Sequence, residues 1–229
     1  MNQLPINKIL VAGFAFAITH WRRILQISIV PLILSLPFFL IVPEMLDIMK
    51  KLPLQEEFTT PNNMVTNNMV IYSLLFLYAC ISLSISIFRL VLGTESVGIM
   101  PIIEPLKIGK FIALALFIGA LNLIAAFSGL WLILPLLGFL LAPIMLNFVN
   151  IAIEKPIKYR WNLPFVTHLN LFFLQVIVPE LVVFLFYSLF SIIDLGENAS
   201  LAAKVIMFYW SAITLPLCYH LITTAKQNP

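Results

Sequence analysis

The chain of 229 residues is 62% hydrophobic and only 10% charged, and its mean hydropathy is +1.05. Soluble domains carry roughly 45–50% apolar and about 25% charged residues, so this composition excludes a water-soluble fold. The formal charge of +3 is spread over many positions instead of forming one basic patch, which argues against a nucleic-acid partner. We therefore expect an all-α, polytopic membrane helix bundle that forms a single integral membrane domain over residues 1–229.

The first segment, residues 4–19, is expected to be a helix that does not cross the membrane. Its continuous apolar part, Ile9 to Ile18, would reach only about 15 Å as a helix, half the thickness of a bilayer core. Its apolar residues recur at the spacing of one helix face. This pattern predicts a helix that lies in the membrane interface or against the bundle.

Six longer apolar runs are each of the length that a membrane crossing requires, which is about 20 residues. The predicted spans are residues 24–43, 69–92, 111–130, 131–153, 172–193 and 204–222. The third and fourth spans adjoin, and Ser128-Gly129 is predicted to break them into a helical hairpin because glycine suits a tight turn.

The distribution of basic residues predicts the orientation of the protein. With six spans, ten Lys and Arg residues fall on the side of the two termini and three on the other side. Positive residues near span ends favour the cytoplasm, so both termini are predicted to be cytoplasmic. The polar connection at residues 44–68 then lies outside, either as a solvated linker or as a loop that binds a partner.

One short pattern occurs twice in the same register. Residues 19–31 begin with Thr-His and end with Ile-Val-Pro, and so do residues 167–179. Two explanations stay open. One is an ancestral duplication that gives a parallel internal repeat, as in some transporters, and the other is chance recurrence in a sequence composed mostly of apolar residues. If the repeat is real, the membrane entrance of the fifth span lies near Asn170 and the span begins at Phe172.

Glu180 is the acidic residue inside a predicted span, and it follows Pro179. An acid near the centre of a membrane helix costs about 2.5–3.5 kcal/mol, so we expect Glu180 to face other helices. In a functional interpretation Glu180 is a proton or cation site. In the structural interpretation, which we favour, it is either a neutral acid hydrogen-bonded to a carbonyl freed at the proline kink or an ion-paired residue near the membrane interface. The polar residues that could share its level are Gln175, Asn147, Asn150 and Arg89.

Other candidate sites carry weaker signals. Arg22 and Arg23 are candidates for contact with lipid headgroups, although positive flanks are expected of any first span. The histidines and cysteines lack the spacing of a metal site, so no metal and no cofactor is expected. The sequence also lacks His-Glu-x-x-His, Gly-x-Ser-x-Gly and a phosphate-binding glycine loop. No catalytic residue is assigned, and we expect the protein not to be an enzyme.

Three polar stretches carry a loose resemblance to a known group. They are Trp21-Arg22-Arg23 with Pro31, Arg89 to Gly93 with Glu95, and Trp161 with Thr167 and Asn170. In these the chain resembles uncharacterised proteobacterial multi-pass inner-membrane proteins, distantly similar to the membrane domain attached to some glycerophosphodiester phosphodiesterases. The sequence departs from that group where Asn147 and Asn150 stand in place of an expected arginine. The resemblance implies a bacterial inner membrane and does not imply phosphodiesterase activity.

Together these observations predict a non-catalytic multi-pass membrane protein that acts as a scaffold or accessory component. Its expected partners are membrane lipids, other membrane proteins or further copies of itself. The alternative is a small secondary transporter that uses Glu180. A water-accessible cavity that reaches Glu180 would favour the transporter.

Overall fold

The computed structural model describes residues 4–51, 63–93, 105–127, 133–158, 161–193 and 195–224. In these ranges the chain is helical and contains no strand, which confirms the all-α prediction. The elements in chain order are α1 (Ile6–Thr19), α2 (Trp21–Lys51), α3 (Asn63–Leu92), α4 (Pro105–Phe127), α5 (Ile133–Ala152), α6 (Phe165–Phe172), the π-helix η2 (Phe173–Ile177), α7 (Val178–Ser191) and α8 (Gly196–Thr224).

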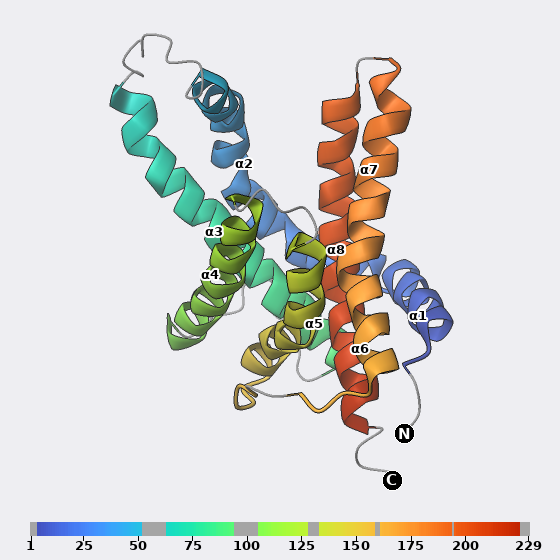
Figure 1. The fold of residues 1–229 in the computed structure, drawn as a ribbon. Helices are drawn as coiled ribbons and strands as arrows, with labels where there is room; N and C mark the ends of the chain where they lie inside the picture. Colours follow the sequence, from blue (N-terminus) through green and yellow to red (C-terminus); the bar gives the residue numbers. More distant parts are fainter. Residues whose placement is uncertain are drawn as a thin grey trace.

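Six stretches of the described chain are long and apolar enough to cross a bilayer, and each overlaps one predicted span. They are residues 21–42, 68–92, 105–125, 133–152, 165–191 and 196–224. The fifth combines α6, η2 and α7 into one span. Successive spans run in opposite directions, so the chain starts and finishes at the same end of the bundle, which we call the terminal end (Figure 1).

Helix α8 is the centre of the bundle and packs against α1, α3, α5, η2 and α7. Half of its apolar window is buried, compared with 11% of the window in α4. Ile85 of α3, Leu146 of α5 and Cys218 of α8 are all fully buried in one hydrophobic cluster. Each of them lies in the half of its helix nearer the terminal end. The core therefore lies there, and beyond it the α2–α3 pair and the α7–α8 pair diverge (Figure 1).

Helix α1 packs against α8, as one of the two placements predicted for it. With 14 residues it extends only about 21 Å, too short to cross a bilayer. Gly13 makes the close approach possible, because a Cβ at this position would lie 3.2 Å from Cγ2 of Thr214. Next to it, the rings of Phe14 and Trp210 lie 5.0 Å apart between centroids. The packing fixes α1 without requiring it to span.

The predicted start of the fifth span at Phe172 is wrong, because the helix begins seven residues earlier, at Phe165. The polar residues of this first segment have partners inside the bundle. His168 stacks on Phe139 of α5, with 4.1 Å between ring centroids, and its Nε2 lies 2.6 Å from the Phe139 carbonyl oxygen. The Asn170 side chain donates a hydrogen bond of 2.8 Å to the carbonyl oxygen of Leu4. Satisfied in this way, these residues extend the helix instead of marking its end.

The predicted linker at residues 44–68 is partly wrong as well. Helix α2 continues to Lys51 and α3 begins at Asn63, so helix occupies both ends of that segment. Residues 45–51 read MLDIMKK, which contains good helix formers and no glycine or proline. The predicted break at Ser128-Gly129 lies outside the described residues, between the end of α4 and the start of α5.

The two copies of the Thr-His pattern run in the same direction, because α2 and the α6–α7 span both lead away from the terminal end (Figure 1). Their backbones differ. A turn at His20 separates α1 from α2 in the first copy, whereas the second copy is one helix with a π-helical stretch. Common origin of the two copies stays a prediction.

Candidate functional site

Asn147 and Asn150 were predicted to lie at the same membrane depth as Glu180. Instead, both stabilise the end of α5. Asn147 is 2% exposed, and its side chain binds the backbone of Lys158 in both directions. Its Nδ2 donates to the Lys158 carbonyl oxygen at 2.9 Å, and its Oδ1 accepts from the Lys158 N–H at 2.9 Å. Asn150 donates to the same Oδ1 at 3.0 Å. These contacts fix the chain that leaves α5, so the pair has a structural role at the terminal end.

Arg89 also lies at the terminal end, where it joins α3 to the chain that follows α5. Its Nε donates to the carbonyl oxygen of Ala152 at 3.0 Å, and its guanidinium lies 3.6 Å from the carboxylate of Glu154. Lys107, near the start of α4, donates a hydrogen bond to the same carboxylate. The Lys107 ammonium and then the Arg89 charge hold the pKa of Glu154 below its ordinary value of 4.5. Glu154 thus connects three spans just outside the membrane segment.

Glu154 occupies an unusual backbone position at the end of α5. Its φ is 62°, in the left-handed region that favours glycine. The next residue, Lys155, donates its N–H to the carbonyl oxygen of Asn150 at 2.8 Å, which closes the helix as in a Schellman motif. A carboxylate at a position suited to glycine is explained by its contacts with Lys107 and Arg89.

Gln175 lies in the π-helix and turns toward α8. Pro179 has no N–H to donate to the carbonyl four residues earlier, which is that of Gln175, and such a loss often widens a helix locally. The Gln175 side chain is 5% exposed and donates to Oγ1 of Thr214 at 2.9 Å. Thr214 in turn donates to the carbonyl oxygen of Trp210. Gln175 therefore ties the fifth span to α8.

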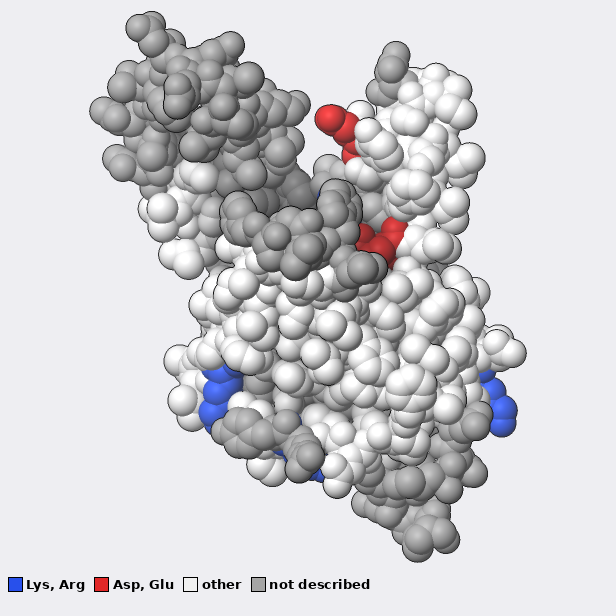
Figure 2. Space-filling view, viewed as in Figure 1, with Lys and Arg blue, Asp and Glu red and all other residues white. Residues whose placement is uncertain are grey.

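Glu180 is separate from all of these residues. It lies fifteen residues after Phe165, or about 22 Å along the helix, and its side chain is exposed. In the described part of the chain it makes no hydrogen bond and no ion pair. Helix α7 packs mainly on α8, and none of its residues is buried. Among the described residues, no neighbouring helix covers Glu180, and the expectation that it faces other helices stays a prediction. Figure 2 shows acidic side chains on the α7–α8 pair, in the half of the molecule away from the termini.

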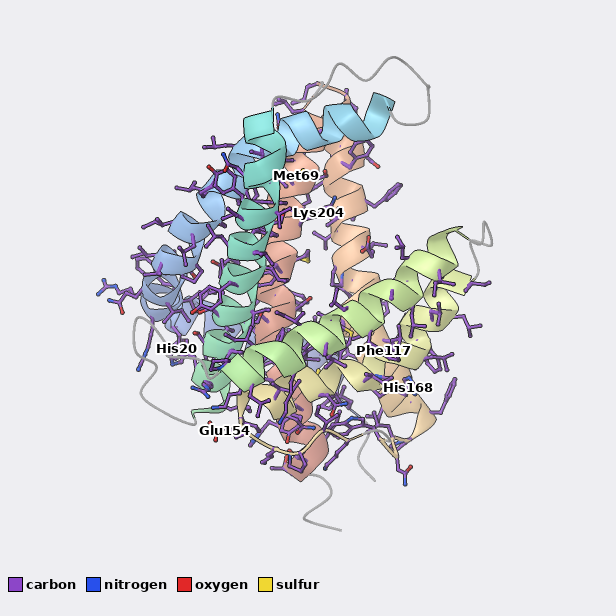
Figure 3. All side chains as sticks on the ribbon, turned by 90° about the vertical axis from the view of Figure 1, so that its left-hand side faces the viewer. His20, Met69, Phe117, Glu154, His168 and Lys204 are labelled. Atoms are coloured by element: carbon purple, nitrogen blue, oxygen red, sulfur yellow. The ribbon has the colours of Figure 1, made fainter. Side chains whose placement is uncertain are left out.

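A cavity of about 400 Å³ opens at the terminal end, between the start of α4 and the end of α5. We call it the α4–α5 cavity. Figure 3 shows Glu154, which borders it, at this end of the molecule, and Lys204 of α8 toward the other end. The residues that line it are Leu106, Lys107, Lys110, Ile151, Glu154, Lys155, Pro156 and Ile157.

The remaining sequence candidates lie apart from one another. Arg22 and Arg23 are exposed in the first turn of α2, and the Arg22 guanidinium lies 5.5 Å from the Trp21 ring centroid. Within the described residues, no three His, Cys, Asp or Glu side chains are grouped in a way that could hold a metal ion.

The sequence interpretation missed the α4–α5 cavity and the partner of Gln175. A signal for the cavity was present, since Lys107 and Lys110 precede the third span and Lys155 follows the fourth. The two ends of a helical hairpin lie side by side, so these lysines had to meet. No comparable signal marked Thr214, which is one of many hydroxyl residues in the apolar spans.

The fold defines the protein as a multi-pass α-helical membrane protein with polar ties at its terminal end. No family model, curated protein or solved structure matches the chain.

Proposed function

We propose that the protein is a non-catalytic accessory or scaffold component of a bacterial inner membrane, which packs with lipids and with other membrane proteins through α7. The observation that carries the proposal is Glu180, an exposed acid deep in a span and without a hydrogen-bond or ion-pair partner among the described residues. The bacterial inner membrane is proposed from the resemblance described above, and cytoplasmic termini from the distribution of basic residues.

The environment of Glu180 favours contact with another protein. An acid exposed to hydrocarbon has neither water nor a hydrogen-bond partner to offset its desolvation. On the same helix Leu181 is 55% exposed and Phe184 is 66% exposed. Within the membrane, the carboxyl group of Glu180 can gain a hydrogen bond only from another protein segment or a lipid headgroup, and polar side chains commonly form such bonds between transmembrane helices.

The polar residues that could have formed a path for protons or cations to Glu180 have other roles. Asn147 binds the backbone after α5, Arg89 binds Glu154 and Gln175 binds Thr214. The α4–α5 cavity is lined by other residues and lies at the terminal end. These contacts support a structural role for the protein in preference to transport. Transport is kept as one possible outcome of the test.

Photo-crosslinking in native membranes tests the proposal. A photoreactive phenylalanine analogue at Phe184, one turn from Glu180, is compared with the same analogue at Phe117 of α4, which is 52% exposed. We expect a light-dependent adduct with protein at position 184 and only lipid adducts at position 117. Glu180→Leu should abolish the protein adduct, whereas Glu180→Gln, which keeps the shape and hydrogen bonding, should retain it.

Two results would contradict the proposal. Lipid adducts alone at both positions would show that α7 faces the bilayer without a partner. Proton-coupled uptake into vesicles that Glu180→Gln abolishes, with expression unchanged, would establish the transporter instead.

The orientation is tested separately by cysteine labelling of intact cells. A membrane-impermeant reagent should label a cysteine placed at Asn62 and should fail to label one placed at Gln227. The opposite labelling pattern would overturn the proposed topology.

A further inference from the structure

The charges around the α4–α5 cavity suit an anion. Three lysines and one glutamate line it, so its lining carries two net positive charges. The glutamate, Glu154, is already bound by Lys107 and lies 3.6 Å from Arg89. Its negative charge is thus compensated locally, and Lys110 and Lys155, which are both exposed, supply positive charge to the cavity.

The backbone contributes partial charges of both signs, because the cavity lies between the start of α4 and the end of α5. Helix α4 begins at Pro105, and the first N–H groups of a helix have no partner within it. They carry the partial positive charge of the helix dipole and favour a phosphate or a carboxylate nearby. Leu106, Lys107 and Lys110 of the cavity lining belong to these first turns. The carboxyl end of α5 carries the opposite partial charge beside the same cavity, so the net positive charge there comes from the lysines.

The position of the cavity indicates where the anion comes from. It lies where the third span begins and the fourth ends, at the depth at which headgroups meet a transmembrane bundle. Its rim includes Leu106, which is 67% exposed, and the outer face of α4 continues with Leu116 at 65% and Phe117 at 52%. A lipid whose phosphate lies in the cavity can lay its acyl chains on this apolar face. A soluble anion would not use that surface.

We propose that the α4–α5 cavity binds the phosphate of an anionic phospholipid through Lys110 and Lys155. The acyl chains of that lipid lie along α4. Basic pockets between transmembrane helices are known to bind such headgroups. This site is distinct from the exposed face of α7 around Glu180, and it does not depend on the proposed function.

Native mass spectrometry of the full-length protein in mild detergent tests the site. Phosphatidylglycerol is titrated into wild-type protein, the double variant K110Q/K155Q and the control K204Q, which removes an exposed lysine of α8 at the other end (Figure 3). We expect the double variant to bind phosphatidylglycerol about thirtyfold more weakly than wild type. K204Q should bind as wild type does, and K110R/K155R should restore binding.

Two further arms identify the ligand. Zwitterionic phosphatidylcholine should bind far more weakly than phosphatidylglycerol, a comparison that needs no variant. Inorganic phosphate at millimolar concentration should fail to displace the lipid. Equal binding of phosphatidylglycerol by wild type and K110Q/K155Q would overturn the site, as would equal binding of the two lipids by wild type. Displacement by inorganic phosphate would assign the cavity to a soluble anion and overturn the lipid assignment.

Discussion

Replacing Asn147 by leucine should destabilise the protein much more than the same change at Asn150. Both asparagines are buried on α5, three residues apart, and differ in what they bind. Asn147 takes part in three hydrogen bonds, two of them with the Lys158 backbone. At a net value of about 1 kcal/mol each, their loss costs about 3 kcal/mol. Water at the exposed Lys158 recovers part of this, so we expect about 2 kcal/mol.

Asn150→Leu is the matched control. Asn150 donates one hydrogen bond, to Asn147, while its own Oδ1 is buried without a hydrogen-bond donor in the described structure. The substitution removes one bond and also removes an unsatisfied buried oxygen, so the two effects should cancel to within about 1 kcal/mol. Asn147 keeps both of its bonds with Lys158 in this variant.

Thermal unfolding in detergent measures the difference. For a chain of this size 1 kcal/mol corresponds to about 2–4 °C, so Asn147→Leu should unfold about 4–8 °C below wild type. Asn150→Leu should stay within about 4 °C of wild type. If Asn150→Leu is the more destabilising of the two, the assignment of Asn147 as the residue that holds the end of α5 is refuted.

Two further predictions concern the packing of α1 and the contacts of Glu154. Gly13→Val should detach α1, because even a Cβ would lie 3.2 Å from Cγ2 of Thr214, and proteolysis between α1 and α2 should become faster. The control is Gly119→Val, since nothing lies within 4 Å of a Cβ at that position. Equal rates of proteolysis for both variants would contradict the packing of α1 on α8. Because Lys107 and then Arg89 lower the pKa of Glu154, the contribution of this carboxylate to stability is fully present above its ordinary pKa of 4.5 and is lost as the pH falls through the lowered value. Glu154→Gly suits the local φ of 62°, so this variant lacks the carboxylate without straining the backbone. The unfolding temperature of wild type should therefore fall relative to that of the variant below about pH 4.5. A difference between the two unfolding temperatures that is constant from pH 7 to pH 3 would show that the carboxylate contributes nothing.

The candidate site shows where prediction from the sequence failed. Glu180, Gln175, Asn147 and Arg89 were grouped because all are polar residues in or beside apolar spans. The structure places them in three separate environments: Gln175 of η2 is bound to α8, Asn147 and Arg89 lie at the terminal end, and Glu180 is exposed. Polarity alone gives neither the depth of a residue nor the direction in which its side chain points. Both depend on how each helix is rotated and on which neighbour it packs against.

The sequence by itself determined the all-α class and the number of spans found in the described chain. These depend on the transfer of about 20 consecutive residues from water to hydrocarbon, which is a property of local composition. The tertiary structure decided the extra seven residues of the fifth span. The polar side chains of His168 and Asn170 find their hydrogen-bond partners in α5 and in the segment before α1, which are distant in the sequence. It also decided that Gln175 meets Thr214, 39 positions away, and that lysines from two helix ends surround one cavity. Such pairs are absent from the local pattern because their energy arises only when the helices are packed together.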